Sequence, residues 1–195
     1  MRYDAEHKER TRARVLTEAA KAIRAEGPHR VGVAGVMAKA GLTHGGFYAH
    51  FSSKNDLVVA AMAQMFAESR ANFERLTRGK LPAVALRAYI DFYLSAKHRD
   101  AHDAGCPLPA LSADLPRLEA AAHQQFALGV TWLTSALADL LAALGQADAE
   151  ALASSVLAEL VGALSLARGV ANAKQSNAML KRSSEGLKSR LDLTD

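Results

Sequence analysis

The chain has 195 residues, half of them hydrophobic, which is enough for a buried core. Its single cysteine excludes an intrachain disulfide, which fits a reducing cytosol. The net charge of +4 is uneven, because residues 1–55 hold ten Lys/Arg against five Asp/Glu, whereas residues 56–195 hold fourteen against fifteen. The N-terminal excess of positive charge is expected of a surface that binds phosphate, and a solvated basic face is the alternative.

The first helix is predicted from Glu6 to Glu26. Val15, Ala19 and Ile23 recur at helical spacing and form one apolar face. Gly27-Pro28 ends it, since glycine accepts the left-handed cap and proline cannot continue a helix. The many charges before this face are unlike a signal peptide.

The next stretch predicts a helix-turn-helix. Val33–Ala40 has the pattern of a short helix, and Gly41 can take a positive φ in the turn that follows. Thr43 is placed to cap the next helix through its side-chain oxygen. That helix carries Phe47 and Phe51, four apart and expected in the core. A helix, a glycine turn and a small-residue helix are the layout of a DNA-reading motif.

Long helices are predicted for the rest of the chain. Ser53 and Asp56 have the spacing of a capping box, which starts the first of them. No strand-like alternation is present, so the predicted fold is all-α. The apolar run Phe126–Gly145 is interrupted by Asp139, which favours a buried helix over a membrane span. The predicted domains are 1–54 and 55–195, and the expected helices are 54–78, 82–99, 106–113, 116–144, 148–173 and 175–191.

The helix after Thr43 is suited to close approach to DNA. A recognition helix enters a major groove about 12 Å wide, so a slim leading face is needed, and Gly45, Gly46 and Ala49 provide it. Two adjacent glycines cost roughly 1 kcal/mol each in helix propensity, and close contact of backbone with DNA would justify that cost. Four nearby side chains carry donors suited to phosphate oxygens, namely Thr43, Tyr48, His50 and Lys54.

Residues 10–57 resemble the DNA-binding domain of the TetR/AcrR family of transcriptional regulators. The resemblance lies in Ala-Gly-Leu-Thr at 40–43, Phe-Tyr-Ala-His-Phe at 47–51 and Ser-Lys-Asn-Asp-Leu at 53–57. It implies a homodimer that binds double-stranded operator DNA, a C-terminal helical ligand domain, and repression relieved by a small molecule. It also implies that the four donors named above touch phosphate.

The stretch departs from the family pattern in its base-reading groups. Residues 31–35, Val-Gly-Val-Ala-Gly, lack a capping hydroxyl and an arginine, and Gly46 stands where a larger side chain is common. The remaining base-reading candidates are His44, Lys39 and the Ala49 methyl. This predicts greater dependence on backbone contacts and on DNA shape.

A ligand pocket is expected among bulky side chains of the middle helices, where each of them has plain core packing as its alternative. The chosen candidates are Met62, Phe66, Tyr89, Phe92, Tyr93, Cys106 and Trp132.

Cys106 precedes Pro107, and proline favours the first helical position. Cys106 is therefore predicted to be an N-cap whose pKa is lowered by the helix dipole. The segment Gly105–Arg117 resembles a stretch in a subgroup of the family, some members of which respond to electrophiles or oxidants through a cysteine at this position. A small buried residue at a helix start is the alternative.

The predicted helices 148–173 and 175–191 are assigned to a dimer interface that forms a four-helix bundle. Small residues there permit close approach and larger ones supply apolar area. The set is Ala151, Ser155, Ala158, Gly162, Ser165 and Gly169 with Leu152, Val156, Leu160, Val161 and Leu164.

The sequence thus predicts a cytoplasmic transcriptional regulator, a repressor released by a small-molecule inducer or electrophile or by modification of Cys106. No enzyme activity, cofactor, metal or membrane partner is predicted. One alternative is a thiol enzyme that uses Cys106 with His98 or His102 as base. The other is a scaffold of the same fold that does not bind DNA.

Overall fold

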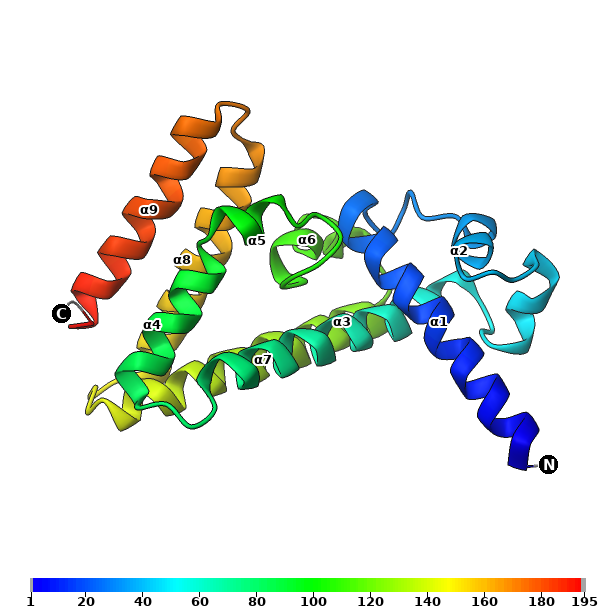
Figure 1. Cartoon of the computed structure of the whole chain (residues 1–195), viewed down its shortest axis with the longest axis horizontal. Coiled ribbons are helices and arrows are strands. Elements are labelled where there is room, and N and C mark those ends of the chain that lie inside the picture. Colours follow the sequence, from blue (N-terminus) through cyan, green and yellow to red (C-terminus); the bar gives the residue numbers. More distant parts are fainter. Residues whose placement is uncertain (1, 194–195) are drawn as a thin grey trace.

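The computed structural model describes residues 2–193, and within that range the chain is all helical, without a strand (Figure 1). The all-α prediction is therefore confirmed. The elements are α1 (Arg2–Glu26), α2 (Val33–Lys39), the 3-10 helix η1 (His44–Ala49), α3 (Lys54–Thr77), α4 (Pro82–Tyr93), α5 (Ala96–Asp100), α6 (Leu108–Leu111), the 3-10 helix η2 (Leu115–Arg117), α7 (Ala120–Ala143), α8 (Ala149–Gly169) and α9 (Ala173–Arg190).

Two hydrophobic cores lie along one long helix. The N-terminal core joins α1, α2 and η1 to the first half of α3, and it ends near Met65 on that helix. The C-terminal core begins at Phe66 and is built mainly from α4, α7, α8 and α9. Because α3 contributes to both cores, it connects the two parts of the molecule as one continuous element (Figure 1).

Prolines and one serine divide helices that the sequence predicts as longer. The expected helix 82–99 is broken after Tyr93, since the Ser95 hydroxyl accepts the His98 N–H at 3.1 Å and starts α5. The expected helix 106–113 shrinks to the four residues of α6, and α7 begins at Ala120 instead of 116. Proline lacks an N–H and disfavours helical geometry in the residue before it, which fits the short α6 after Pro107 and the separate η2 at Pro116 before α7.

The predicted turn and cap residues behave as local stereochemistry requires. Gly27 and Gly41 take φ of +83° and +70°. The Ser53 hydroxyl accepts the Asp56 N–H at 3.0 Å and caps α3. The Asp56 carboxylate closes the return bond on the N–H of Ser52, one residue earlier than a reciprocal capping box would place it.

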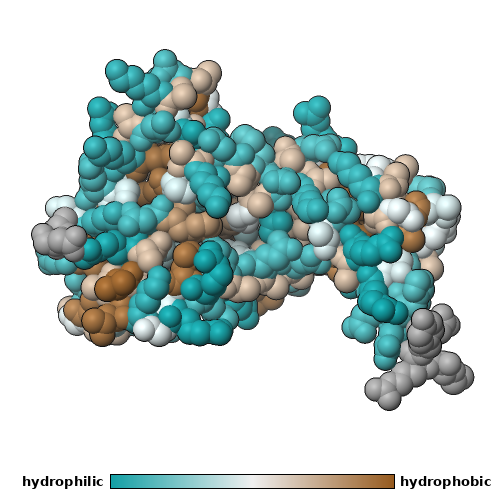
Figure 2. All heavy atoms as spheres, viewed as in Figure 1, coloured by the Kyte–Doolittle hydropathy of each residue, from teal (hydrophilic) through white to brown (hydrophobic). Residues whose placement is uncertain are grey.

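Two of the helices, α7 and α8, are long and apolar enough to cross a membrane by length and composition alone. They pack against each other, and their inward residues form much of the C-terminal core. Only 28 % of the most apolar stretch of each helix is buried within the chain. Apolar side chains also gather where α3 turns into α4, including the exposed Leu81, while the α1 side of this view is mostly hydrophilic (Figure 2). In this view the larger exposed apolar patches therefore lie on the C-terminal part.

Candidate functional site

The turn before η1 is held by a contact from α1. The Arg14 guanidinium donates to the carbonyl of Ala40, the last residue before the Gly41 turn. A methyl group at Gly41 would lie 3.2 Å from that guanidinium, on a backbone with φ +70°. Glycine is therefore required at this position, and α1 fixes the direction in which η1 leaves α2.

The predicted recognition helix forms as a 3-10 helix instead of an α-helix. The Gly46 N–H bonds the Thr43 carbonyl at 3.1 Å, an i to i+3 contact. The Thr43 side chain makes no capping hydrogen bond, so that prediction is wrong. Two glycines weaken α-helical propensity here, and the short turn satisfies the leading N–H through the backbone. The Thr43 hydroxyl is left on the exposed side of the turn.

Aromatic side chains divide η1 into a buried face and an exposed face. Phe47 and Phe51 are each 2 % exposed and stack with ring centroids 5.6 Å apart, which confirms their predicted core position. Tyr48 meets Phe47 edge-on but is 73 % exposed, so it is not a core residue. Anchoring by the two phenylalanines thus presents the Tyr48 hydroxyl to solvent on a fixed element.

The two predicted lysines flank this surface and already have partners in the chain. The Lys54 ammonium donates to the His29 carbonyl at 3.0 Å, which ties the start of α3 to the loop after α1. Lys39 lies 3.9 Å from Glu26, and both side chains are at least half exposed. An exposed pair at this distance contributes little to stability, so Glu26 holds the Lys39 ammonium only weakly.

His50 lies at the end of η1 with its pKa lowered by burial and by the nearby charges of Lys8 and Arg12. It is therefore neutral at neutral pH and offers one ring N–H. Its Nδ1 is buried and has no partner among the described residues. His44, Gly45 and Ala49 are also exposed on η1, so six of the eight residues predicted to contact DNA lie within residues 43–50, and Lys39 and Lys54 lie in the flanking helices α2 and α3.

Substitution of Gly45 by alanine tests whether DNA closely approaches the backbone of η1. A methyl group built there meets nothing within 4 Å, and its φ is not positive, so nothing within the chain requires glycine. We expect Gly45→Ala to hold or raise stability by about 0.5–1 kcal/mol. We also expect at least tenfold weaker operator binding, because the added methyl occupies the contact surface. Thermal unfolding and fluorescence anisotropy measure the two effects.

Gly186, inside α9 and also without neighbours, provides the matched control. Gly186→Ala should stabilise the helix similarly, and in protein that light scattering shows to have the same oligomeric state as the native chain it should leave operator affinity unchanged. Equal operator affinity for Gly45→Ala and the native protein would contradict the close-approach interpretation.

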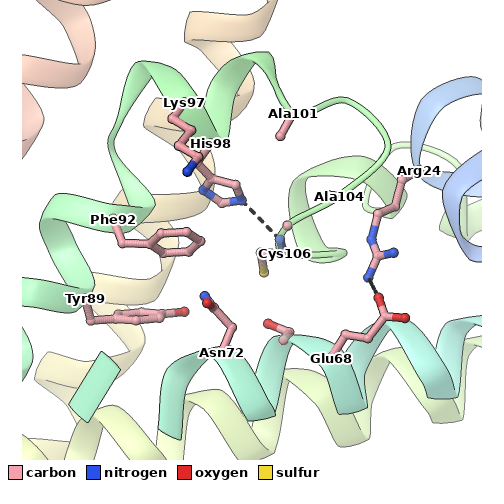
Figure 3. A pocket seen from close by; sticks show the side chains of 12 residues that line it. Arg24, Glu68, Asn72, Tyr89, Phe92, Lys97, His98, Ala101, Ala104 and Cys106 are labelled. Carbon is pink, nitrogen blue, oxygen red and sulfur yellow. Dashed lines mark hydrogen bonds and ion pairs between the residues drawn. The ribbon is translucent and has the colours of Figure 1, made fainter. Parts of the chain in front are cut away.

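A cavity of about 340 Å³ lies where the two cores meet, on the side of α3 that faces α4 and α5 (Figure 3). Its wall combines the last turn of α1 with side chains of three further helices and of the loop before α6. The lining residues are Arg24, Glu68, Ser69, Asn72, Tyr89, Phe92, Lys97, His98, Ala101, Ala104, Gly105 and Cys106.

The structure brings some of the predicted ligand residues to this cavity and separates the others. Tyr89, Phe92 and Cys106 line it. Tyr93 is fully buried behind it, and its ring meets His98 edge-on at 5.0 Å. Phe66 and Trp132 line a separate groove between α3 and α7, and Met62 is fully buried in the N-terminal core. Phe66 and Trp132 also meet Cys106 around a small second hollow, whereas Met62 belongs to the other core.

Sequence reasoning missed the polar half of the cavity. Glu68, Ser69 and Asn72 lie on one face of α3, but the surrounding segment, residues 68–75, is polar on most sides, so the sequence carried no clear signal for them. Arg24 lies in α1, 44 residues before its partner Glu68 in the sequence. No local sequence pattern indicates that the two residues pair.

Cys106 differs from its prediction in both position and ionisation. The N-cap of α6 is Pro107, and Cys106 is 5 % exposed. Burial raises the pKa of its thiol above the ordinary value, and this effect outweighs the donors and the positive charge nearby. A four-residue helix has too small a dipole to reverse it. The expected low-pKa thiolate is therefore wrong for the resting protein.

His98 explains the shape of the loop around Cys106. Its Nδ1 lies 2.9 Å from the Tyr93 carbonyl, and its Nε2 accepts the Cys106 backbone N–H at 3.1 Å. Acceptance by Nε2 requires the neutral imidazole with its proton on Nδ1, and burial lowers the pKa of His98 to about 4. Because Nε2 is engaged with the backbone N–H, His98 is not placed as a base for the thiol. This arrangement speaks against the thiol-enzyme alternative.

Comparison with known proteins agrees with this architecture. Residues 15–61 match the family model described as "Bacterial regulatory proteins, tetR family". No curated protein matches the chain. Among solved structures, a TetR-family transcriptional regulator from Streptomyces coelicolor is 25% identical with a TM-score of 0.75, covering 93% of this chain and 95% of that one.

Two further solved structures share the fold. A TetR transcriptional regulator from Chloroflexus aurantiacus has 23% identity and a TM-score of 0.83, covering 96% of both chains. The reduced form of Escherichia coli NemR has 19% identity and a TM-score of 0.80, covering 92% of this chain and 95% of that one. The helix-turn-helix and the family match show that residues 15–61 form a DNA-binding domain of the TetR family of bacterial regulatory proteins, and the solved structures show that the whole chain has the fold of TetR-family transcriptional regulators.

Proposed function

We propose that the protein is a cytoplasmic repressor that leaves its operator when a small molecule occupies the cavity between its two cores. One observation carries this proposal: Arg24, in the helix that orients η1, forms part of the same cavity wall as Tyr89 and Phe92. An occupant of the cavity therefore touches both the DNA-binding part and the C-terminal part. Differential contact of this kind is what allows a ligand to shift a conformational equilibrium.

A gel shift with DNA from upstream of the protein's own gene tests the proposal. We expect a complex at low salt, with log K falling by about 0.9 per neutralised phosphate for each unit of log salt. Absence of a complex at low salt would favour the non-binding scaffold. The position of the site relative to the promoter then decides between repression and activation.

The proposed assembly is a homodimer formed through α8 and α9. Ala151, Ser155 and Ala158 are exposed on one side of α8, and Leu166 is 62 % exposed. Val156, Leu160 and Leu164, assigned to the interface from sequence, are instead buried within the chain. The small residues support close helix approach and a four-helix bundle between two copies. A monomer in light scattering at micromolar concentration would contradict it.

Modification of Cys106 is the second proposed trigger, and the position of the thiol in the cavity wall supports it. Its raised pKa predicts slow alkylation at pH 7, because the thiolate is the nucleophile. As pH rises toward and beyond the ordinary thiol pKa, the alkylation rate should keep climbing instead of reaching a plateau. Mass spectrometry of iodoacetamide-treated protein across pH measures that rate.

Operator binding by the alkylated protein completes this test. The added group fills part of the cavity, so we expect weaker operator binding than in a Cys106→Ser control treated in the same way. Fast alkylation at pH 7 would contradict the buried-thiol environment. Unchanged operator affinity after complete alkylation would remove Cys106 as a trigger.

A further inference from the structure

We propose that the cavity selects a planar, largely apolar molecule that carries a carboxylate, and that this carboxylate binds Arg24 in place of Glu68. The inference rests on the proposed function of the cavity and names the chemical class of its ligand. It also names the contact through which that ligand acts on α1.

Arg24 is a buried guanidinium whose hydrogen bonding is incomplete. Its side chain is 4 % exposed, and its Nη2 donates to a Glu68 carboxylate oxygen at 2.6 Å and to the Met65 carbonyl at 3.4 Å. Its Nε is buried and has no partner among the described residues. A buried donor without an acceptor is unfavourable, so a ligand that supplies the acceptor recovers that free energy.

Glu68 is the partner that can leave. Its side chain is 45 % exposed, and its second carboxylate oxygen accepts from Gln64 at 3.0 Å. Glu68 can turn toward water and keep its charge solvated. The buried Arg24 side chain cannot reach water in the same way. An incoming carboxylate therefore exchanges with Glu68 and keeps the guanidinium paired. Arginine presents two parallel N–H groups, which matches a carboxylate better than a single acceptor.

The charges around the cavity favour an anion. Arg24 and Lys97 are the cations in the wall, and Glu68 is its single carboxylate among the described lining residues. His98 adds no charge at neutral pH, because both of its ring nitrogens hold backbone groups in the neutral form. Once Glu68 has turned outward, two cations face the cavity.

The opposite end of the cavity supplies the site for the apolar body. Tyr89 and Phe92 lie across the cavity from Arg24, with Asn72 projecting between them from α3 (Figure 3). Aromatic side chains favour a planar ring system, and a volume of about 340 Å³ is within the range of small-molecule sites.

Binding of the ligand carboxylate to Arg24 alters the contacts between α1 and α3. Arg24 contacts α3 through Glu68 and through the Met65 carbonyl, and Gln64 reaches Thr17 one turn away at 3.2 Å. Gln64 also holds Glu68, so displacement of Glu68 loosens both links. Since α1 fixes the Gly41 turn through Arg14, a shift of α1 is transmitted to η1.

Isothermal titration calorimetry of the whole protein with matched probes tests the proposal. The probes are 2-naphthoate and cinnamate, each with its neutral amide, and 2-naphthylmethylammonium as the cationic analogue. We expect each carboxylate to bind at least tenfold more tightly than its amide, and the cation to bind more weakly than the amide. Equal binding of carboxylate and amide, or no binding of either carboxylate at millimolar concentration, would overturn the proposal.

Two substitutions locate the anion. Arg24→Gln should abolish the preference for carboxylate over amide. Glu68→Gln keeps a side-chain oxygen that can accept from Arg24 but removes the competing charge, so it should tighten carboxylate binding about tenfold, with folding checked by thermal unfolding. Glu74→Gln, on the same helix and paired with Arg78 away from the cavity, should match the native protein. Loss of the preference in Lys97→Gln instead of Arg24→Gln would place the anion elsewhere and contradict the inference.

Operator release separates this inference from the proposed function. If amide and carboxylate release the operator equally, the cavity is a ligand site and the carboxylate proposal fails. If the carboxylate binds through Arg24 but releases no operator, the ligand class is correct and the proposed release mechanism fails. Fluorescence anisotropy of labelled operator with each probe distinguishes the two results.

Discussion

Replacing Tyr48 by phenylalanine is expected to weaken operator binding by about two to four orders of magnitude without changing thermal stability. The hydroxyl is all that the substitution removes, and Tyr48 is 73 % exposed, so the core loses nothing. A hydrogen bond to a charged group contributes about 1.5–3 kcal/mol, and two copies in a dimer lose it together. The measurements are fluorescence anisotropy with operator DNA and thermal unfolding.

The salt dependence of the same variant identifies the partner of the hydroxyl. A neutral donor to phosphate releases no counterion, so the slope of log K against log salt should stay unchanged in Tyr48→Phe. The loss should also be equal on operator and on unrelated DNA, because phosphate contacts carry no sequence information. A loss confined to the operator would instead assign Tyr48 to base reading.

Replacing Gly105 by alanine is expected to be the most destabilising single methyl addition near the cavity. Gly105 has φ +90°, and a methyl built there would lie 2.3 Å from His98 Nε2. The left-handed backbone costs about 1–2 kcal/mol, and overpacking against a buried ring adds about 1–3 kcal/mol. We expect a loss of about 3 kcal/mol or more, with the melting temperature lower by roughly 10 °C.

Gly79 separates the two contributions. It has φ +71° and nothing within 4 Å of a built methyl, so Gly79→Ala should show the backbone cost alone. The difference between the two variants then measures the contact with His98. If both variants lose the same stability, the imidazole moves aside freely, and the His98 bridge between Tyr93 and Cys106 is not rigid.

Much of the fold was predictable because short-range stereochemistry decides it. The apolar stripe of α1, the positive φ at Gly27 and Gly41, and the Ser53 cap each depend on neighbours within a few residues. The aromatic anchors of η1 were predictable for the same reason. The errors, such as the break after Tyr93 and the 3-10 form of η1, fall where local preferences are weak.

The sequence alone determined that this protein is helical, that its N-terminal part carries a helix-turn-helix, and which side chains of that motif face outward. The motif is contiguous, so its spacing is visible in the chain. Only the tertiary structure decided what surrounds Cys106 and which residues form the cavity. Arg24 and Glu68 meet across 44 residues, and His98 reaches back to Tyr93 and forward to Cys106. Burial by elements distant in sequence sets the pKa of the thiol and leaves the Arg24 Nε without an acceptor, and no local pattern records either effect.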